Sequence, residues 1–237
     1  MEIEARPAAA AAVFGERLPL ADRLVGHLAT SGVDRGLIGP RELPRLWTRH
    51  VLNCAVLTEL IPAGVRVIDL GSGAGLPGLV VAVARPDLDI VLVEPLERRV
   101  AWLREVTDEL GVDVTVHRAR AEELAGEVAG QVVTARAVAP LTRLLEWGLP
   151  LVEPGGQVLA IKGRSASVEL EDSAAVLGRW GIDGARVVTC GEALLETPTT
   201  VVRVPRGLGP GAMARGAMPR GGGPAGGRKP NRGRRAG

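Results

Sequence analysis

The hydrophobic pattern of the chain changes near residue 62. Before that point apolar residues recur at intervals of three and four, as at Leu24, Val25 and Leu28, and this spacing predicts amphipathic helices. Glycines at positions 32, 36 and 39 interrupt the pattern, so at least two helices are expected. We therefore predict a helical cap over residues 13–62, preceded by a flexible, alanine-rich lead-in at residues 1–12.

Residues 63–205 alternate short apolar runs with amphipathic stretches, which is typical of repeated β–α units. Seven strands are predicted, at residues 65–70, 90–94, 114–117, 132–135, 158–162, 186–189 and 200–204. No helical stretch separates the last two strands, so they should form an antiparallel hairpin at one edge. The predicted fold is α/β and Rossmann-like, with a seven-stranded, mostly parallel sheet.

The clearest helix is predicted over residues 96–110. Val100, Leu103 and Val106 form an apolar stripe along it, and Gly111 suits the left-handed position that ends many helices. Further helices are expected after Pro77, Ala139 and Ser165.

Composition favours a globular enzyme-sized domain built from aliphatic side chains. Hydrophobic residues make up 46% of the chain and aromatic residues 2%, so Val, Leu, Ile and Ala must fill the core. The two cysteines, Cys54 and Cys190, suggest neither a disulfide framework nor a metal site, and we expect a reducing, cytoplasmic setting. No segment offers the ~20 consecutive apolar residues that a membrane span requires.

Charge is distributed unevenly along the chain. Residues 206–237 contain eight of the 29 basic residues and none of the 27 acidic ones, so residues 1–205 carry a net charge of −6. This tail is rich in Gly, Pro and Arg and is predicted to be disordered. It would either add sequence-independent attraction to RNA or be a low-complexity extension without a specific role.

The strongest local motif follows the first predicted strand and runs from Asp69 to Gly78. Gly71, Gly73 and Gly75 allow the main chain to turn sharply and approach a ligand closely, because no Cβ blocks it. The helix after Pro77 directs its free N–H groups to the same place.

This loop fits two ligand classes. Gly73 to Gly78 match the G-x-G-x-x-G pattern of dinucleotide sites, with Glu94 about 20 residues further on to accept ribose hydroxyls. Asp69 before Gly71 also resembles the acid of the class I methyltransferase signature. A carboxylate there repels a diphosphate but attracts the ammonium and sulfonium of S-adenosylmethionine, so we favour S-adenosylmethionine over NAD. The alternatives are a loop or helix cap for Asp69 and a solvated strand-end acid for Glu94.

Several spaced motifs together resemble those of the glucose-inhibited division protein B family, over about residues 13–205. They are Arg45–Asn53, Asp69–Gly78, Arg118–Glu123, Ala135–Ala137 and Lys162–Gly163. The Ala-, Arg- and Gly-rich composition is similar to that of actinobacterial members. The resemblance implies a cytoplasmic, monomeric guanine-N7 methyltransferase that acts on the decoding-region loop of 16S ribosomal RNA, free or within the 30S subunit or its assembly precursor.

The resemblance also implies which residues bind the cofactor. Gly71 and Leu76 would line it, Ala121 and Glu122 would hold its adenine end, and Arg136 would complete the pocket. All of them lie where strands end, which is where open α/β sheets bind ligands. Asn53 departs from the pattern, because many relatives carry Asp there, and any electrostatic role of that acid is in doubt here.

Methyl transfer to N7 needs no proton removed, because this nitrogen already offers a lone pair. Arg136 and Lys162 are therefore expected to position the reactants, with neither a general base nor a metal ion. The competing hypotheses are an NAD-dependent oxidoreductase and a non-catalytic RNA-binding protein on the same fold.

Contact with RNA should come from cationic side chains near the same strand ends. Arg120, Arg136 and Lys162 are the first candidates for phosphate or base contacts. Arg45, Arg49 and Arg118 are further candidates, with solvated charge or internal ion pairing as the alternative. His50 is expected to be a packed helix histidine and not a catalyst.

Overall fold

The computed structural model describes residues 2–208. The predicted basic tail lies outside the described residues from position 209 onward. None of the helices in the described part of the chain is long and apolar enough to cross a membrane.

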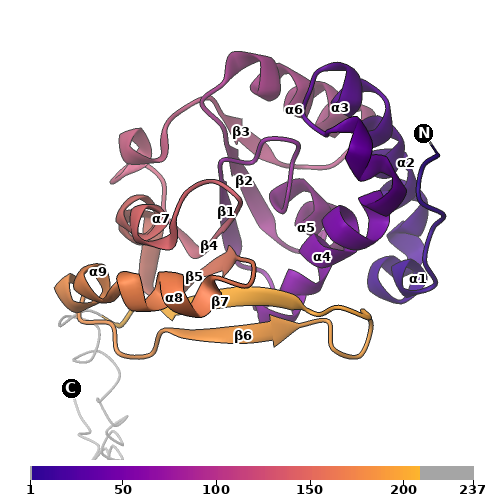
Figure 1. Ribbon diagram of the computed structural model, residues 1–237. Coiled ribbons are helices and arrows are strands. Elements are labelled where there is room, and N and C mark those ends of the chain that lie inside the picture. The colour runs from indigo at the N-terminus through magenta and orange to yellow at the C-terminus, as the bar shows by residue number, and fades with distance from the viewer. Residues whose placement is uncertain (1, 209–237) are drawn as a thin grey trace, which may run out of the picture. The chain divides into compact units, whose positions relative to one another are not determined.

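A seven-stranded sheet forms the centre of the fold (Figure 1). Its strands are β1 Arg66–Leu70, β2 Asp89–Val93, β3 Thr115–His117, β4 Gly130–Arg136, β5 Val152–Ile161, β6 Arg186–Cys190 and β7 Thr199–Pro205, in the order β3-β2-β1-β4-β5-β7-β6. Only β7 runs antiparallel to its neighbours β5 and β6. The predicted α/β class, the seven strands and the hairpin at one edge are confirmed.

Helices connect the parallel strands, as the predicted β–α pattern requires. They are α5 Gly78–Ala84, α6 Glu97–Leu110, α7 Leu141–Gly148, α8 Ala166–Asp172 and α9 Ala174–Arg179, with short 3₁₀ turns at Ala121–Leu124 and Leu149–Leu151. Gly111 ends α6 in the left-handed conformation, with a φ of 64°, as predicted. The helix expected after Ser165 is divided into α8 and α9 at Ser173.

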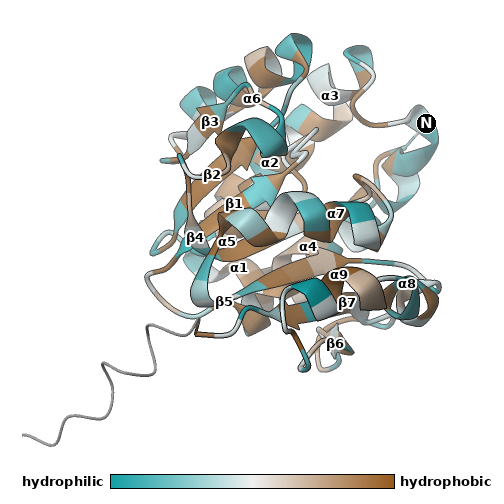
Figure 2. Ribbon diagram, turned by 90° about the vertical axis from the view of Figure 1, so that its left-hand side faces the viewer, coloured by the Kyte–Doolittle hydropathy of each residue, from teal (hydrophilic) through white to brown (hydrophobic). Residues whose placement is uncertain are grey.

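Neighbouring strand residues point to opposite faces of the sheet and build two separate apolar cores. Val67 packs with α2, α5 and α6, whereas Ile68 packs with α7, α8 and α9. Val132 and Val133 divide in the same way. Figure 2 shows the apolar strands between helices whose outer faces are hydrophilic. This alternation explains why the strands consist of continuous apolar runs, because both faces are covered.

The N-terminal region is helical, as predicted, but it consists of many short pieces. They are α1 Ala9–Phe14, a 3₁₀ turn at Gly15–Arg17, α2 Leu18–Ala29, α3 Ser31–Asp34, a 3₁₀ helix at Pro40–Arg45, a π-helix at Leu46–Leu52, α4 Asn53–Ala55 and a 3₁₀ helix at Val56–Leu60. The region packs on one face of the sheet, where Leu28 and Trp102 share an apolar core and the Trp102 indole Nε1 donates to Ser31 Oγ at 2.9 Å.

The first residues differ from the flexible lead-in expected at residues 1–12. Helix α1 begins at Ala9, and Ala10 is fully buried. Before it, the Glu4 backbone N–H donates to Leu43 O at 2.9 Å, and the Glu4 carboxylate accepts from the Thr48 N–H at 3.0 Å. Alanine is a strong helix former with a small side chain, so an Ala-rich stretch packs as a helix without a marked hydrophobic pattern.

Arg206, the first residue of the predicted tail, is bound to the folded domain. The Arg206 N–H donates to Gly156 O at 2.8 Å, and its guanidinium lies 4.9 Å from the centre of the Trp180 ring. Arg206 therefore belongs to the folded part, because its main chain extends the β5–β7 pairing and its side chain stacks on an aromatic ring.

Candidate functional site

The glycine loop joins β1 to α5 at the carboxyl ends of the parallel strands. Gly71, Gly73 and Gly75 have φ angles of 66°, 55° and 77°, which other residues rarely adopt. The Gly71 and Ser72 N–H groups both donate to Val93 O, at 2.8 and 3.1 Å, and tie the loop to the end of β2. The loop therefore has a defined path that depends on glycine.

Asp69 lies fully buried at the base of this loop. Its Oδ2 accepts a hydrogen bond from the Gly78 N–H at 3.0 Å, whereas Oδ1 has no partner among the described residues. Burial raises the pKa of this carboxyl from 3.8 to about 7. Asp69 thus caps the start of α5, which was one of the two roles expected for it, and keeps one oxygen free.

Gly78 is required by the position of Asp69. A Cβ at residue 78 would lie 2.6 Å from the Asp69 Cβ and would also overlap the Leu92 side chain. The absence of a side chain at Gly78 therefore allows α5 to approach β1 and β2.

Glu94 supports the loop from the end of β2. Only 1% of the residue is exposed; its Oε2 accepts from the Gly73 N–H and its Oε1 from the Leu96 N–H, both at 3.0 Å. The Arg99 guanidinium lies 3.5 Å from Oε2. Each carboxylate oxygen has a second lone pair, so these bonds leave capacity for ligand hydroxyls.

A cleft of about 220 Å³ opens between the glycine loop and the N-terminal region. Its lining residues are Leu37, Ile38, His50, Gly71, Ser72, Gly73, Ala74, Leu76, Arg99, Arg136 and Ala137. The structure thus brings together four of the predicted residues: Gly71, Gly73, Leu76 and Arg136. Gly75 shapes the loop without lining the cleft.

Seven lining residues were not predicted as ligand contacts: Leu37, Ile38, His50, Ser72, Ala74, Arg99 and Ala137. Leu37 and Ile38 follow α3 in a turn before Gly39, and nothing in their local pattern distinguishes them from core residues. The position of Arg99 in the first turn of α6, five residues after Glu94, is the one local signal that could have found it.

The residues expected at the adenine end lie elsewhere. Ala121 and Glu122 form the 3₁₀ turn after β3 and are not among the residues that line the cleft. Arg120 precedes this turn with an exposed side chain, and the Arg118 guanidinium lies 3.2 Å from the Glu97 carboxylate, with both side chains exposed.

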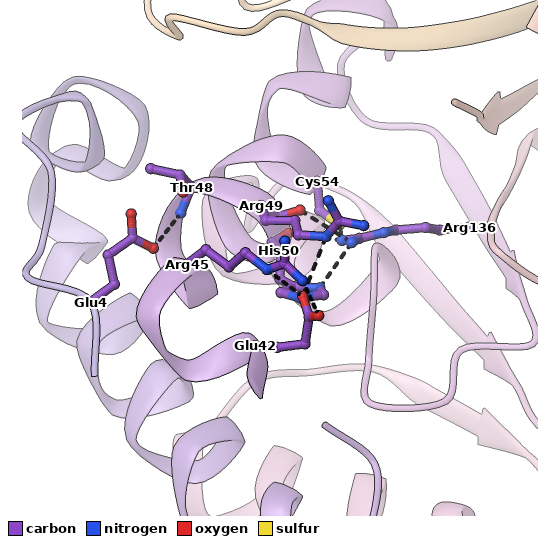
Figure 3. A network of polar contacts seen from close by, with 8 residues as sticks. All are labelled: Glu4, Glu42, Arg45, Thr48, Arg49, His50, Cys54 and Arg136. Atoms are coloured by element: carbon purple, nitrogen blue, oxygen red, sulfur yellow. Dashed lines mark hydrogen bonds and ion pairs between the residues drawn. The ribbon is translucent and has the colours of Figure 1, made fainter. Parts of the chain in front are cut away.

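Arg136 joins the end of β4 to the N-terminal region (Figure 3). Its Nη1 donates to His50 O at 3.2 Å and to Cys54 Sγ at 3.1 Å. Its Nη2 donates to Arg49 O at 3.1 Å and contacts His50 Nδ1 at 2.8 Å. The guanidinium therefore fixes one wall of the cleft against the other.

Arg45 and Arg49 lie together around a shared carboxylate. Glu42 accepts from Arg45 Nη2 at 2.5 Å and lies 3.3 Å from Arg49 Nε (Figure 3). The hydrogen bond from Arg45, with help from His50, lowers the pKa of Glu42 to about 2. The side chains of Arg45 and Arg49 are 50% and 58% solvent-accessible.

Lys162 does not line the cleft. Its ammonium donates to Ala139 O and to the Glu169 carboxylate, both at 2.7 Å, and its side chain is 9% exposed. Glu169 also accepts from the Leu141 N–H at 2.9 Å. The ion pair thus ties together the loops after β4 and β5, and the side chain points inward because Glu169 lies seven residues further on, in α8.

The Asn53 side chain donates a hydrogen bond that the aspartate of many relatives could not donate. Its Nδ2 donates to Thr199 Oγ1 at 2.7 Å, and that hydroxyl donates to Asn53 O at 2.9 Å. A carboxylate has no donor for the first bond.

Comparison with known proteins gives a consistent result. The family model described as rRNA small subunit methyltransferase G matches residues 17–196. The ribosomal RNA small subunit methyltransferases G of Pseudarthrobacter chlorophenolicus and Salinispora arenicola are 60% and 57% identical to this chain; the alignments cover 83% and 84% of this chain and 91% and 85% of theirs. A methyltransferase structure from Pyrococcus furiosus has a similar fold, with a TM-score of 0.55 at 16% identity, covering 82% of this chain and 100% of that one.

We predict that Gly78→Ala disrupts the loop. The added Cβ meets the Asp69 side chain, so overpacking should lower the free energy of unfolding by roughly 1 to 3 kcal/mol in urea titrations. Gly163→Ala is the matched control, since a Cβ there meets nothing within 4 Å. Equal stability of the two variants would show that α5 has room at residue 78.

Asp69→Asn should change how stability depends on pH. The pKa of Asp69 is raised to about 7 in the folded state. Its contribution to the free energy of unfolding is therefore full below pH 3.8 and is lost as the pH rises to about 7. The amide does not titrate, so between pH 3.8 and about 7 the free energy of unfolding of the variant should rise relative to that of the parent, by on the order of 4 kcal/mol. Urea titrations at several pH values measure this, with the exposed Asp113→Asn as control; parallel curves for Asp69→Asn and the parent contradict it.

Lys162→Met should act on stability and not on RNA affinity. Removal of the ammonium leaves the Glu169 carboxylate without its cation, at a cost of roughly 2 kcal/mol in unfolding free energy. The salt dependence of RNA binding should match that of the parent, whereas loss of a phosphate contact would reduce its slope by about one.

Proposed function

This chain belongs to the rRNA small subunit methyltransferase G family, and on that premise we propose that it transfers the methyl group of S-adenosylmethionine to N7 of a guanine in 16S ribosomal RNA. The observation that carries this proposal is the family match over residues 17–196 together with a cleft at the glycine loop. Family membership favours neither alternative hypothesis, NAD-linked oxidation or RNA binding without catalysis.

The residues present fit this cofactor. Gly71 and Gly73 line the cleft and have no side chains, so a ligand can approach the main chain of the loop closely. Asp69 lies buried beneath the loop and not in the lining of the cleft, and its Oδ1 has no partner among the described residues; in its ionised form this carboxyl would favour a cationic ligand. Arg99 and Arg136 line the cleft and suit the carboxylate at the methionine end.

Within this proposal, Gly71, Gly73, Gly75 and Leu76 hold the cofactor against the loop. Glu94 would accept the ribose hydroxyls with its second lone pairs, although it is 1% exposed and lies outside the lining of the cleft. Ala121 and Glu122 receive the adenine end, as the family resemblance implies, although they lie outside the cleft that the described residues form.

When bound, the cofactor supplies a methyl group made electrophilic by its sulfonium. Guanine N7 has an in-plane lone pair, so the protein has no proton to remove, and its contribution is to align the reacting atoms and exclude water. Arg136 would do this directly at the cleft, while Lys162 would act through the loop after β4 that carries Ala137.

RNA contact is proposed for Arg45, Arg49 and Arg136 beside the cleft, and for Arg118 and Arg120 after β3. A cluster of cations on a body of net negative charge directs a polyanion to one place. We further propose that the protein acts as a cytoplasmic monomer on 16S RNA, either free or within the 30S subunit or its precursor.

The test is transfer of labelled methyl from S-adenosylmethionine to naked 16S RNA and to 30S subunits, followed by mass mapping of the product. One N7-methylguanine is expected. Absence of transfer to either substrate, or tight binding of NAD without binding of S-adenosylhomocysteine, contradicts the proposal.

Arg136→Ala should reduce kcat/KM by roughly a hundredfold, because the variant loses the guanidinium that fixes the cleft wall. Arg186→Ala, an exposed change on β6, is the control and should leave the rate unchanged. Thermal unfolding of both variants separates lost catalysis from lost folding. Full activity of Arg136→Ala shows that the site lies elsewhere.

A further inference from the structure

His50 lies at the junction between the cleft and the N-terminal region. It belongs to the π-helix Leu46–Leu52, lines the cleft beside Arg136, and has a side chain that is only 12% exposed. Both ring nitrogens are engaged: Nδ1 lies 2.8 Å from Arg136 Nη2, and Nε2 lies 2.8 Å from the Glu42 carboxylate (Figure 3).

These two contacts assign the proton on the ring. A guanidinium is only a donor, so His50 Nδ1 must accept from Arg136 and carry no hydrogen. The hydrogen of the neutral ring then lies on Nε2, which donates to the Glu42 carboxylate. Glu42 therefore selects the tautomer that Arg136 requires.

We infer that His50 is a positioning residue for the proposed methyl transfer: its unprotonated Nδ1 holds the Arg136 guanidinium at the cleft, and Glu42 fixes its tautomer. This inference deepens the proposed function and rests on it. His50 touches the reaction only through Arg136, so it takes no part in proton transfer.

The surroundings keep the ring neutral. Burial lowers the pKa of His50 below 6.5, the Arg136 charge lowers it further, and Arg49 on the same element adds to this effect. Among residues 2–208, Glu42 is the one carboxylate that faces the ring, and it raises the pKa of His50. Cys54, on the far side of Arg136, stays a neutral thiol because burial raises its pKa.

Protonation of His50 would place a second N–H against Arg136, which has no acceptor to offer. The guanidinium would lose its Nδ1 acceptor and meet a positive charge, so the cleft wall would be displaced. Since attack by guanine N7 needs no protein base, a fall in rate toward acid pH reports such positioning groups.

The experiment measures kcat and KM for cofactor and RNA across pH 5 to 8 for the parent, His50→Asn, His50→Ala and Glu42→Gln. The Asn Oδ1 can replace Nδ1 as acceptor, so His50→Asn should stay within about threefold of the parent at pH 8 while losing the acid limb that His50 causes. His50→Ala lacks the acceptor and should lose roughly tenfold to a hundredfold. In Glu42→Gln the acid limb should move to lower pH, because Glu42 raises the pKa of His50.

His27→Asn is the matched control. His27 also contacts a carboxylate, Glu109, at 3.3 Å, but it lies in α2 and does not line the cleft. Its rates and pH profile should equal those of the parent. The buried carboxyl of Asp69 also titrates in this range, and its effect is recognised because the His50 and Glu42 variants leave it in place.

A second measurement does not depend on activity. The nitrogen chemical shifts of His50 in the free protein should report the neutral Nε2–H tautomer, with a pKa below 6.5 that rises in Arg136→Ala, because this variant lacks the positive charge beside the ring. A proton on Nδ1, or equal rates for His50→Ala and the parent, overturns the inference. If the parent transfers no methyl group but shows the expected tautomer, the proposed function fails and the contact between His50 and Arg136 stands.

Discussion

The guanidinium of Arg136 is the contact on which the candidate site depends. It extends from the last residue of β4 and donates to two main-chain carbonyls, a thiol and an imidazole of the N-terminal region. The sheet alone provides only the glycine side of the cleft, whereas His50, Leu37 and Ile38 come from the other side of this contact. The geometry of the cleft therefore depends on one long polar side chain whose Nη1 and Nη2 groups both contact the N-terminal region.

The regular elements were predictable because their signals are local. The stripe of α6 and its end at Gly111, and the apolar runs that became β1, β2, β4 and β5, follow from spacings of a few residues. The Asp69–Gly78 loop was also predictable, because Gly71, Gly73 and Gly75 have backbone angles that other residues rarely adopt. Ala10 shows where prediction from spacing fails. It is buried in α1, but the alanine run around it has no alternation of apolar and polar residues.

The partners of the charged residues could not be predicted in the same way. Arg136 and His50 are 86 positions apart, so their contact follows from how the chain packs and not from any motif. Lys162 illustrates the consequence: its position after β5 suggested a surface cation, but Glu169 in α8 turns its ammonium inward. Motifs thus placed Gly71, Gly73, Leu76 and Arg136 in one cleft, while the packing decided which cations face the solvent.

The shared carboxylate of Glu42 has a consequence for selectivity. It partly neutralises Arg45 and Arg49 before any polyanion approaches. In the proposed RNA complex, a nucleic acid that offers charge alone would therefore gain less from these two cations than it would from unpaired ones. An RNA whose shape also filled the neighbouring cleft would recover the difference, so such an arrangement would favour discrimination among substrates over non-specific affinity.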